Sequence, residues 1–367
     1  MKNYLLRITP LEPFTFGGEN GFSFEEIGYK GTYYMKSGMA PEQTTIIGMI
    51  RYLLLKSEGK LNPSFSYSEE EKKDIATICG PATFSFEPEG PQSFGYIKSI
   101  SPLFIIDEDN DIYIKNPFCN KAKKLESSDN SYKALKLMNL STQIDCSMGE
   151  GFSFPSDKEE DGYNAKDGYG SGYICINANK SENQRLKESS DFFKSSNLVG
   201  NRKNTQKEDD NFFKREVITM KNASFGVYMT LDDNAAELVS GTIVYMGKKK
   251  SAFRVDAERV SETITLKEQA EAFFASYGFS EKWYYCLSDV LPQGRIEYKN
   301  FGITESKLIR NLKTDYSNKG MHRKGQKRYS LIVAGSVFYG EIPKALQIDN
   351  YELKKVGYNQ IIKLGGK

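Results

Sequence analysis

Apolar residues in the stretch Ala40–Lys56 recur at the spacing of one face of an α-helix. The positions that share this face are Ile46, Ile47, Ile50, Leu53 and Leu54. Pro41 is expected at the first helical position, where its fixed φ suits the helix. Thr44, Gly48 and Arg51 recur on another face. A glycine within a helix lowers helix stability by about 1 kcal/mol relative to alanine, so Gly48 calls for an explanation. Either another chain approaches the backbone at Gly48, or this is an ordinary core helix with one solvated arginine.

Alternating apolar and polar residues predict strands through most of the chain, and periodic segments predict further helices. Strands are expected at Asn3–Ile8, Tyr29–Met35, Leu103–Ile106, Ile112–Ile114, Tyr173–Ile176, Ser224–Leu231, Gly241–Met246, Ala252–Val255, Tyr329–Tyr339 and Gln360–Lys363. Trp283–Val290 is expected to be either a strand or an apolar packing segment. Helices are expected at Ser68–Cys79, Lys187–Phe193, Leu231–Val239 and Thr265–Tyr277, with a helical piece near Tyr132–Leu140. Ser68 and Glu71 stand at the spacing of a capping box, and Gly80 ends that helix. Phe14–Phe24 is expected to be a glycine-rich loop.

The order strand, helix, strand, hairpin occurs once on each side of about Glu216. It predicts an α+β fold with two ferredoxin-like domains of the split-βαβ kind, covering residues 1–215 and 216–367. A polar insertion at about 120–161 interrupts the first domain. The segment Leu198–Met220 has apolar ends and a polar middle, which predicts two extended arms with an exposed tip.

Composition narrows the possible chemistry. With a net charge of +2, the chain has no global preference for an acidic or basic partner, so basic residues must be judged where they cluster. Five cysteines without CxxC spacing favour a reducing cytoplasm, and a single histidine, His322, disfavours a zinc site, a histidine-based triad or a haem. We therefore expect no metal and no cofactor. Pro10 and Pro13 interrupt the start, and no apolar run approaches the roughly 18 residues of a membrane span, so neither a signal peptide nor a membrane partner is expected.

Three motifs resemble ligand sites and are interpreted otherwise. Asp107–Asp111 resembles the start of a calcium loop but lacks its glycine and final glutamate, so we interpret it as a hairpin turn. Gly241–Lys248 has the wrong spacing for a phosphate-binding P-loop. The run Gly168–Tyr173 could present backbone N–H groups to phosphate but is more typical of a simple turn.

Two basic segments are candidates for contact with RNA. Lys248, Lys249 and Lys250 form a cationic turn that is either solvated or bound to phosphate. Lys313–Arg328 is expected to be a flexible basic loop that could follow an RNA backbone, with neighbouring tyrosines available to stack on bases. His322 within it could act as a general acid or base in metal-independent RNA cleavage, although no second histidine exists.

Several stretches together resemble one protein family, the RAMP superfamily of CRISPR-associated proteins. A "P-x-x-T-x-x-G-x-x-R" helix after the second strand matches Pro41, Thr44 or Thr45, Gly48 and Arg51. A "G-I-x-R-x-T … L-F-x-x-E" segment matches Gly200, Arg202, Thr205, Phe212, Phe213 and Glu216, with Asn201 in place of the isoleucine. The turn YMGKKKSAF resembles a "G-G-x-x" turn with Lys248 in place of the second glycine, and the C-terminal strands with their glycine-rich end also match. Within the superfamily the chain resembles the type III-B (Cmr) subunit that holds the 5′ handle of the guide RNA, and the type III-A and III-D equivalents remain open.

This resemblance implies two RRM-like domains, a β-hairpin thumb at about 197–220 and no nuclease activity. It implies a subunit that binds the 5′ repeat-derived tag of crRNA and bridges the large polymerase-like subunit to a RAMP backbone subunit, in antiviral defence. The candidate RNA-binding residues are Thr44, Arg51, Asn201, Arg202, Lys203, Lys248, Lys249, Lys250, His322, Arg323, Lys324, Lys327 and Arg328. Two alternatives remain: a pre-crRNA endoribonuclease that uses His322, and a structural adaptor without RNA contact.

Overall fold

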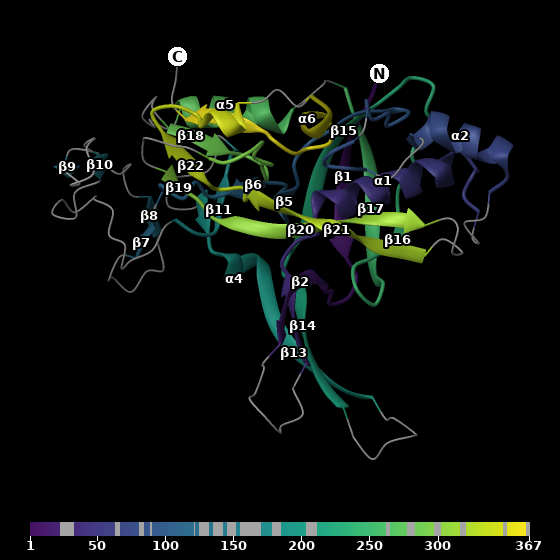
Figure 1. Cartoon of the computed structure of the whole chain (residues 1–367), viewed down its shortest axis with the longest axis horizontal. Coiled ribbons are helices and arrows are strands. Elements are labelled where there is room, and N and C mark those ends of the chain that lie inside the picture. The colour runs from purple at the N-terminus through teal and green to yellow at the C-terminus, as the bar shows by residue number, and fades with distance from the viewer. Residues whose placement is uncertain are drawn as a thin grey trace.

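The computed structural model has a mixed α+β fold, as expected (Figure 1). It describes residues 1–22, 33–62, 67–80, 84–88, 90–120, 122–124, 132–134, 142–144, 152–154, 170–177, 185–202, 211–261, 265–276, 283–296, 302–315, 321–347 and 351–364. The helices in these ranges are α1 (Gln43–Ser57), α2 (Glu69–Cys79), α4 (Ser189–Phe192), α5 (Leu266–Ser276) and α6 (Tyr351–Lys355), with a 3-10 turn at Lys344–Leu346. None of them is both long and apolar enough to cross a membrane.

A nine-stranded sheet forms the centre of the molecule. Its strands in spatial order are β12 (Leu186–Lys187), β11 (Tyr173–Cys175), β6 (Ile112–Lys115), β5 (Phe104–Asp107), β15 (Ala223–Leu231), β1 (Lys2–Pro10), β17 (Ser251–Val260) and β16 (Thr242–Met246), and β4 (Ile97–Ile100) also pairs with β15. β1 lies between β15 and β17, with Leu6 opposite Val227 and Ala257. One sheet therefore joins strands from both sides of residue 216. A division into two domains at this residue would separate β1 from β15 and β17, and the division stays a prediction.

Alternation along the central strands places one core on each face of this sheet. On one face Leu6 and Ile8 pack with the apolar stripe of α1, as its spacing predicted. On the other face Leu5 and Tyr228 pack against α5 and a second sheet, which consists of β19 (Gly302–Ile303), β22 (Val337–Tyr339), β18 (Trp283–Cys286) and β23 (Ile361–Leu364). The helices thus cover opposite faces of the central sheet.

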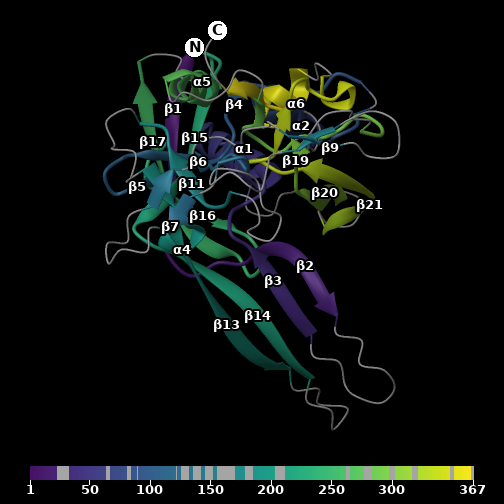
Figure 2. The same ribbon diagram turned by 90° about the vertical axis from the view of Figure 1, so that its left-hand side faces the viewer.

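A four-stranded sheet projects from the body as the predicted thumb (Figure 2). β13 (Phe193–Arg202) and β14 (Asn211–Met220) form the expected antiparallel hairpin. β14 also pairs in parallel with β3 (Tyr33–Gly38), which pairs with β2 (Phe16–Phe22). The glycine-rich loop expected at Phe14–Phe24 is thus largely a strand, because its glycines fit an outer strand of this sheet. The tip of the hairpin lies outside the described residues.

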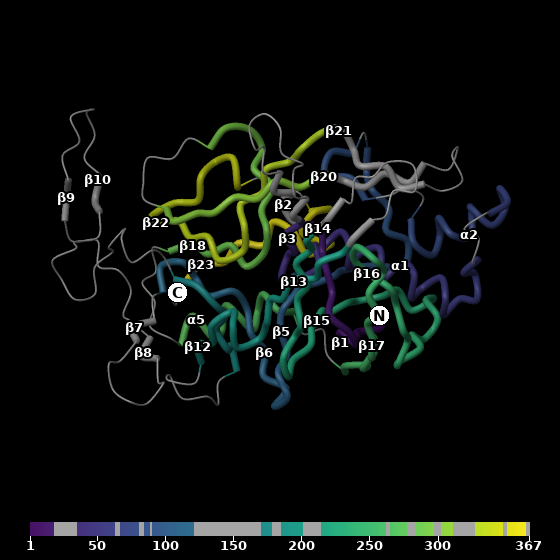
Figure 3. Tube along the Cα trace, turned by 90° about the horizontal axis from the view of Figure 1, so that it is seen from below, coloured from purple at the N-terminus to yellow at the C-terminus, as the bar shows by residue number. Residues whose placement is uncertain are grey.

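The basic segment Lys313–Arg328 was expected to be a flexible loop, but its described residues, 313–315 and 321–328, are strands, and residues 316–320 lie outside the described residues. It lies mostly in a two-stranded antiparallel ribbon formed by β20 (Ser306–Asp315) and β21 (Met321–Ile332). Charged strands are stable where one face packs and the other is solvated, and the apolar residues Ile309 and Leu331 supply the packed face. Figures 2 and 3 place β2 and β3 on the side of the thumb that faces this ribbon.

Three further expectations are corrected. Helix α1 begins at Gln43 with Glu42 as its N-cap, so Pro41 precedes the helix. Residues 232–239 are a turn and not a helix, because the Asp232 carboxylate accepts the N–H of Asn234 at 3.1 Å and closes a local loop. The run Tyr329–Tyr339 is broken near Gly335, whose φ of +100° ends β21 before β22 begins.

The polar insertion contributes two short strand pairs. β7 (Ala122–Lys124) pairs with β8 (Tyr132–Ala134), and β9 (Thr142–Ile144) pairs with β10 (Phe152–Phe154). The helical piece expected near Tyr132–Leu140 is therefore wrong over β8, where pairing with β7 favours an extended backbone. Its remainder lies outside the described residues, as does Cys146.

Candidate nucleic-acid interface

The base of the thumb is held by the carboxylate of Glu216. It accepts hydrogen bonds from the backbone N–H of Ser37 at 3.0 Å and from the hydroxyl of Ser195. The backbone carbonyl of Glu216 also accepts the hydroxyl of Thr15 at 2.9 Å. Since these donors come from β3, β13 and the segment before β2, the motif glutamate fixes the strands to one another. Glu216 matches the family motif in the sequence, but its role as an acceptor between strands is visible only in the structure.

The lysine turn between β16 and β17 packs on the same base. The N–H of Lys248 donates to the carbonyl of Thr15 at 2.8 Å, and its side chain reaches the sulfur of Met35 on β3. Lys249 and Lys250 have φ values of +74° and +56°, which close the turn tightly. All three lysines are exposed. The turn therefore presents its positive charge beside the thumb, as contact with RNA requires.

The three motif residues on helix α1, Thr44, Gly48 and Arg51, differ in burial and in the residues that they contact. Thr44 is partly buried beside Tyr358, whose pKa lies well above its usual value because the ring is buried. Arg51 faces Cys79 of α2, where burial raises the pKa of the thiol to about 12 and the charge of Arg51 opposes that rise. Gly48 is exposed, and a Cβ there would have no atom within 4 Å. Gly48 therefore leaves open space for another molecule, whereas Thr44 and Arg51 are only partly exposed.

The ribbon has a packed face and an exposed cationic face. Tyr329 packs on Phe86, with ring centroids 5.1 Å apart. On the outer face Arg310 stands directly opposite Arg328, and both are exposed. Like charges in opposite positions destabilise a sheet, so this pair favours an external anion. Lys327 instead pairs with Glu87.

Lys307 anchors the ribbon to the body. Its ammonium nitrogen lies 2.6 Å from a carboxylate oxygen of Glu42, the N-cap of α1, and 2.7 Å from one of Asp289, which follows β18. Burial lowers the pKa of Lys307, but the two carboxylates outweigh burial and raise it above the usual value. Lys307 was not predicted as a functional residue, because nothing local to β20 indicates its distant partners.

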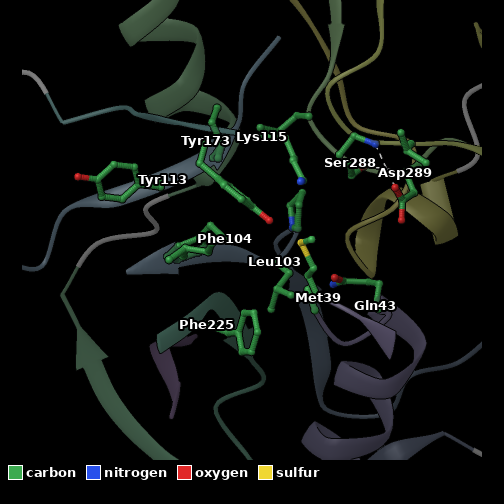
Figure 4. Close-up of a pocket in the computed structure, with 18 of the residues that line it drawn as sticks. Met39, Gln43, Leu103, Phe104, Tyr113, Lys115, Tyr173, Phe225, Ser288 and Asp289 are labelled. Atoms are coloured by element: carbon green, nitrogen blue, oxygen red, sulfur yellow. Dashed lines mark hydrogen bonds between the residues drawn. The ribbon is translucent and has the colours of Figure 1, made fainter. Parts of the chain in front are cut away.

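A cavity of about 530 Å³ opens between the start of α1, strands β5, β6 and β11, and the Lys307 anchor. Figure 4 shows Lys115 and Tyr173 pointing into it. The Lys115 ammonium lies 4.2 Å from the centroid of the Tyr173 ring, a cation–π contact. Leu103 and Phe104 add apolar lining, and polar side chains such as Gln43 and Asp289 also line the cavity. The sequence signalled this site only through the glycine–tyrosine run that ends at Tyr173.

Gly170 and Gly172 of that run serve packing. The N–H of Gly170 donates to the carbonyl of Phe118 at 2.9 Å, so it is not available to phosphate. A Cβ on Gly170 would lie 2.0 Å from the carbonyl oxygen of Asn120, and one on Gly172 would lie 2.3 Å from that of Lys187. Side chains cannot fit at these positions, so the glycines let the chain approach the cavity wall.

The acidic motif forms the expected hairpin turn. One carboxylate oxygen of Asp107 accepts the N–H groups of Asp109 and Asp111, each at 3.0 Å. The other oxygen pairs with Lys187 at 3.0 Å. Burial raises the pKa of Asp107, but the hydrogen bond from Lys187 and the backbone outweighs burial and lowers it. These bonds account for the cluster without an ion.

The remaining predicted contacts lie at the ends of the two hairpins. Asn201 and Arg202 stand at the end of β13, whereas Lys203 lies outside the described residues. His322, Arg323 and Lys324 stand near the start of β21, opposite Thr314, Lys313 and Leu312. The structure thus places the Lys248 turn and Arg202 at the thumb, Arg51 on α1, and the cations from Arg323 to Arg328 on the ribbon. RNA contact at every one of these residues stays a prediction.

Comparison with known proteins identifies the family. Residues 6–276 match the model of the family described as CRISPR-associated protein (Cas_Cmr3). A chain of the type III-B Cmr-beta complex bound to cognate target RNA is 15% identical, with a TM-score of 0.47 over 98% of this chain and 96% of that one. A chain of that complex bound to cognate target RNA and AMPPnP is 14% identical, with a TM-score of 0.46 over 98% of each chain. No curated protein sequence matches. Because the family model spans most of its length, the chain belongs to the Cas_Cmr3 family of CRISPR-associated proteins.

Proposed function

We propose that this type III CRISPR effector subunit binds the 5′ repeat-derived tag of crRNA and does not cleave it. We further propose that it bridges the large polymerase-like subunit to a RAMP backbone subunit. Family membership supports the general role. The tag itself, the bridging and the absence of cleavage rest on the motifs at Pro41–Arg51 and Gly200–Glu216.

One observation carries the proposal: the cavity that contains Lys115 and Tyr173. Its volume of about 530 Å³ lies within the range of small-ligand pockets. The Tyr173 ring is buried, but its hydroxyl points into the cavity and can hydrogen-bond the edge of a base, and Lys115 offers charge for a phosphate. Gly38, at the end of β3, lines the cavity, so the site continues into the base of the thumb. A strand of RNA could therefore pass from the cavity to the cationic Lys248 turn.

The proposal includes two RRM-like domains, residues 1–215 and 216–367. Two features support it: antiparallel strands predominate, and α1 and α5, one from each half of the chain, cover opposite faces of the central sheet. In this arrangement the two domains share the β1–β15 pairing.

The identity of co-purified RNA tests the proposal. The chain, isolated within its complex, should carry one short RNA population with a fixed 5′ repeat sequence. Random RNA, or none, would contradict it. The double variant Arg323→Ala with Lys324→Ala should weaken tag binding and reduce its salt dependence, because cations that contact phosphate release counterions. An unchanged salt dependence would show that this part of the ribbon is only solvated.

The two alternatives predict different results. An endoribonuclease should cut repeat RNA in EDTA, and His322→Ala should abolish the cut. Intact RNA under these conditions rejects that activity. A structural adaptor should give no crosslink between RNA and either Arg202 or Arg323, so a crosslink at one of them rejects it.

A further inference from the structure

Arg215 on β14 carries a partly buried guanidinium without a hydrogen-bond acceptor. Its Nε and Nη1 atoms are both buried and unpaired, and no ion pair joins it to the described part of the chain. The neighbouring carboxylate of Glu216 does not serve it, because that group accepts from Ser37 and Ser195. A buried charged donor without a partner is costly, and such groups in native proteins call for a missing partner.

The surroundings of Arg215 indicate what that partner is. In the thumb sheet Arg215 stands opposite Leu198 on β13 and Met35 on β3. Residues directly opposite one another share a face, so these three form one row across the sheet. Lys248 reaches the sulfur of Met35, which brings a second cation to this row. Leu198 is 48% exposed beside it.

We infer that Arg215 and Lys248 bind a phosphate of an RNA strand that crosses the base of the thumb. Nη2 is not among the buried atoms of the Arg215 guanidinium, so its N–H groups can donate to a phosphate oxygen at the surface, and the lysine adds a point charge. The nearby Lys249 and Lys250 favour a chain of phosphates over a single protein carboxylate, since a polyanion uses every cation in the group. This inference rests on the proposed function and names the backbone contact within it.

The variant Arg215→Met tests the inference, because methionine keeps much of the volume and removes the unpaired charge. Without RNA, the full chain should melt at a higher temperature than the wild type, as expected on removal of a buried uncompensated charge. Its affinity for a guide RNA with the 5′ tag should fall about 10-fold or more, and the salt slope should decrease by about 0.7 per lost phosphate contact. Arg215→Lys should recover part of the affinity.

Arg254→Met is the matched control. Arg254 is exposed on β17 and pairs with Asp256 at 2.9 Å, so its loss should leave both melting temperature and RNA affinity close to those of the wild type.

Three outcomes overturn the inference. Lower stability of Arg215→Met with unchanged RNA affinity would make the guanidinium structural. Unchanged affinity and salt slope would remove the phosphate contact even if tag binding by the wild type stands. Normal RNA binding with loss of neighbouring subunits would assign Arg215 to a protein carboxylate. Conversely, if the wild type shows no preference for the tag but Arg215→Met still lowers the salt slope, the proposed tag function fails and the phosphate contact stands.

Discussion

The thumb and the ribbon both carry a partly buried cation near their attachment to the body, but the two cations differ in their partners. Lys307 of the ribbon contacts two carboxylates, at 2.6 and 2.7 Å. Arg215 of the thumb has no acceptor among the described residues. The neutralised Lys307 joins the ribbon to the body, whereas the unneutralised Arg215 is the cation for which we infer an external anion.

The two hairpins are also held by opposite charges. A carboxylate, that of Glu216, joins the strands of the thumb, whereas an ammonium joins the ribbon to α1 and to the loop after β18. The Glu216 carboxylate accepts from backbone and hydroxyl donors, and Arg215 has no acceptor among the described residues. The following predictions test whether this division of roles holds.

Lys307→Met should produce the largest change in stability. The substitution leaves Glu42 and Asp289 close together without their shared cation, so the free energy of unfolding should fall by about 2–4 kcal/mol. Denaturant unfolding measures this change. Lys60→Met, which removes an exposed pair with Asp74, should cost less than about 1 kcal/mol. Equal losses in the two variants would show that Lys307 is no anchor.

The stabilisation from Lys307 has a defined dependence on pH. Its pKa in the folded chain is raised above the usual value of 10.5 by the two carboxylates, against the effect of burial. A raised folded pKa gives stability that is fully present below the unfolded pKa and is lost as pH rises through the folded one. The difference between wild type and Lys307→Met should therefore be constant from about pH 6 to 9 and shrink above about pH 10.5. A decline already between pH 7 and 9 would contradict this linkage.

Glu216→Gln should have an intermediate and more local effect. Hydrogen bonds to a charged group contribute about 1.5–3 kcal/mol, and the amide can keep only part of that contribution. Hydrogen exchange should therefore become faster at Ser37 and along β13 and β14, with little change in β20 and β21. Glu258→Gln, at an exposed position of β17, is the control and should change neither region. Faster exchange in the ribbon as well would mean that the hairpins are not independently anchored.

Gly48→Ala should give the smallest change, and a favourable one. The position is exposed and helical with open space for a Cβ, so alanine should stabilise α1 by about 0.5–1 kcal/mol. If RNA or a neighbouring chain approaches there, affinity for tagged RNA or for the complex should fall at the same time. A gain in stability without any loss of binding would make Gly48 a tolerated helix glycine.

Local sequence signals predicted several elements correctly. Ser68 and Glu71 form the expected capping box of α2, with bonds of 2.7 and 3.2 Å. The apolar stripe of α1 is buried, and the thumb hairpin follows its apolar ends. These features depend on residues three or four apart or on adjacent arms, so the sequence pattern carries them directly.

The candidate site was less predictable. The basic residues of the Lys248 turn were found because they are contiguous, but Lys115, Arg215 and Lys307 were not. The role of each depends on residues that are distant in the sequence. Lys115 contacts Tyr173, and Lys307 contacts Glu42 and Asp289, whereas Arg215 has no acceptor among the described residues. The basic part of the ribbon was predicted to be a loop, because its many charged residues obscure the alternation of apolar and polar positions that indicates a strand.

The sequence by itself thus determined the α+β class, the amphipathic α1, the thumb hairpin and the family motifs, because these follow from short-range periodicity and spacing. Only the tertiary structure decided that β1 joins strands from beyond residue 216, that Lys307 is neutralised and that Arg215 is not. The physical reason is that burial and charge pairing depend on segments brought together from more than 200 positions apart, as Lys307 and Glu42 are.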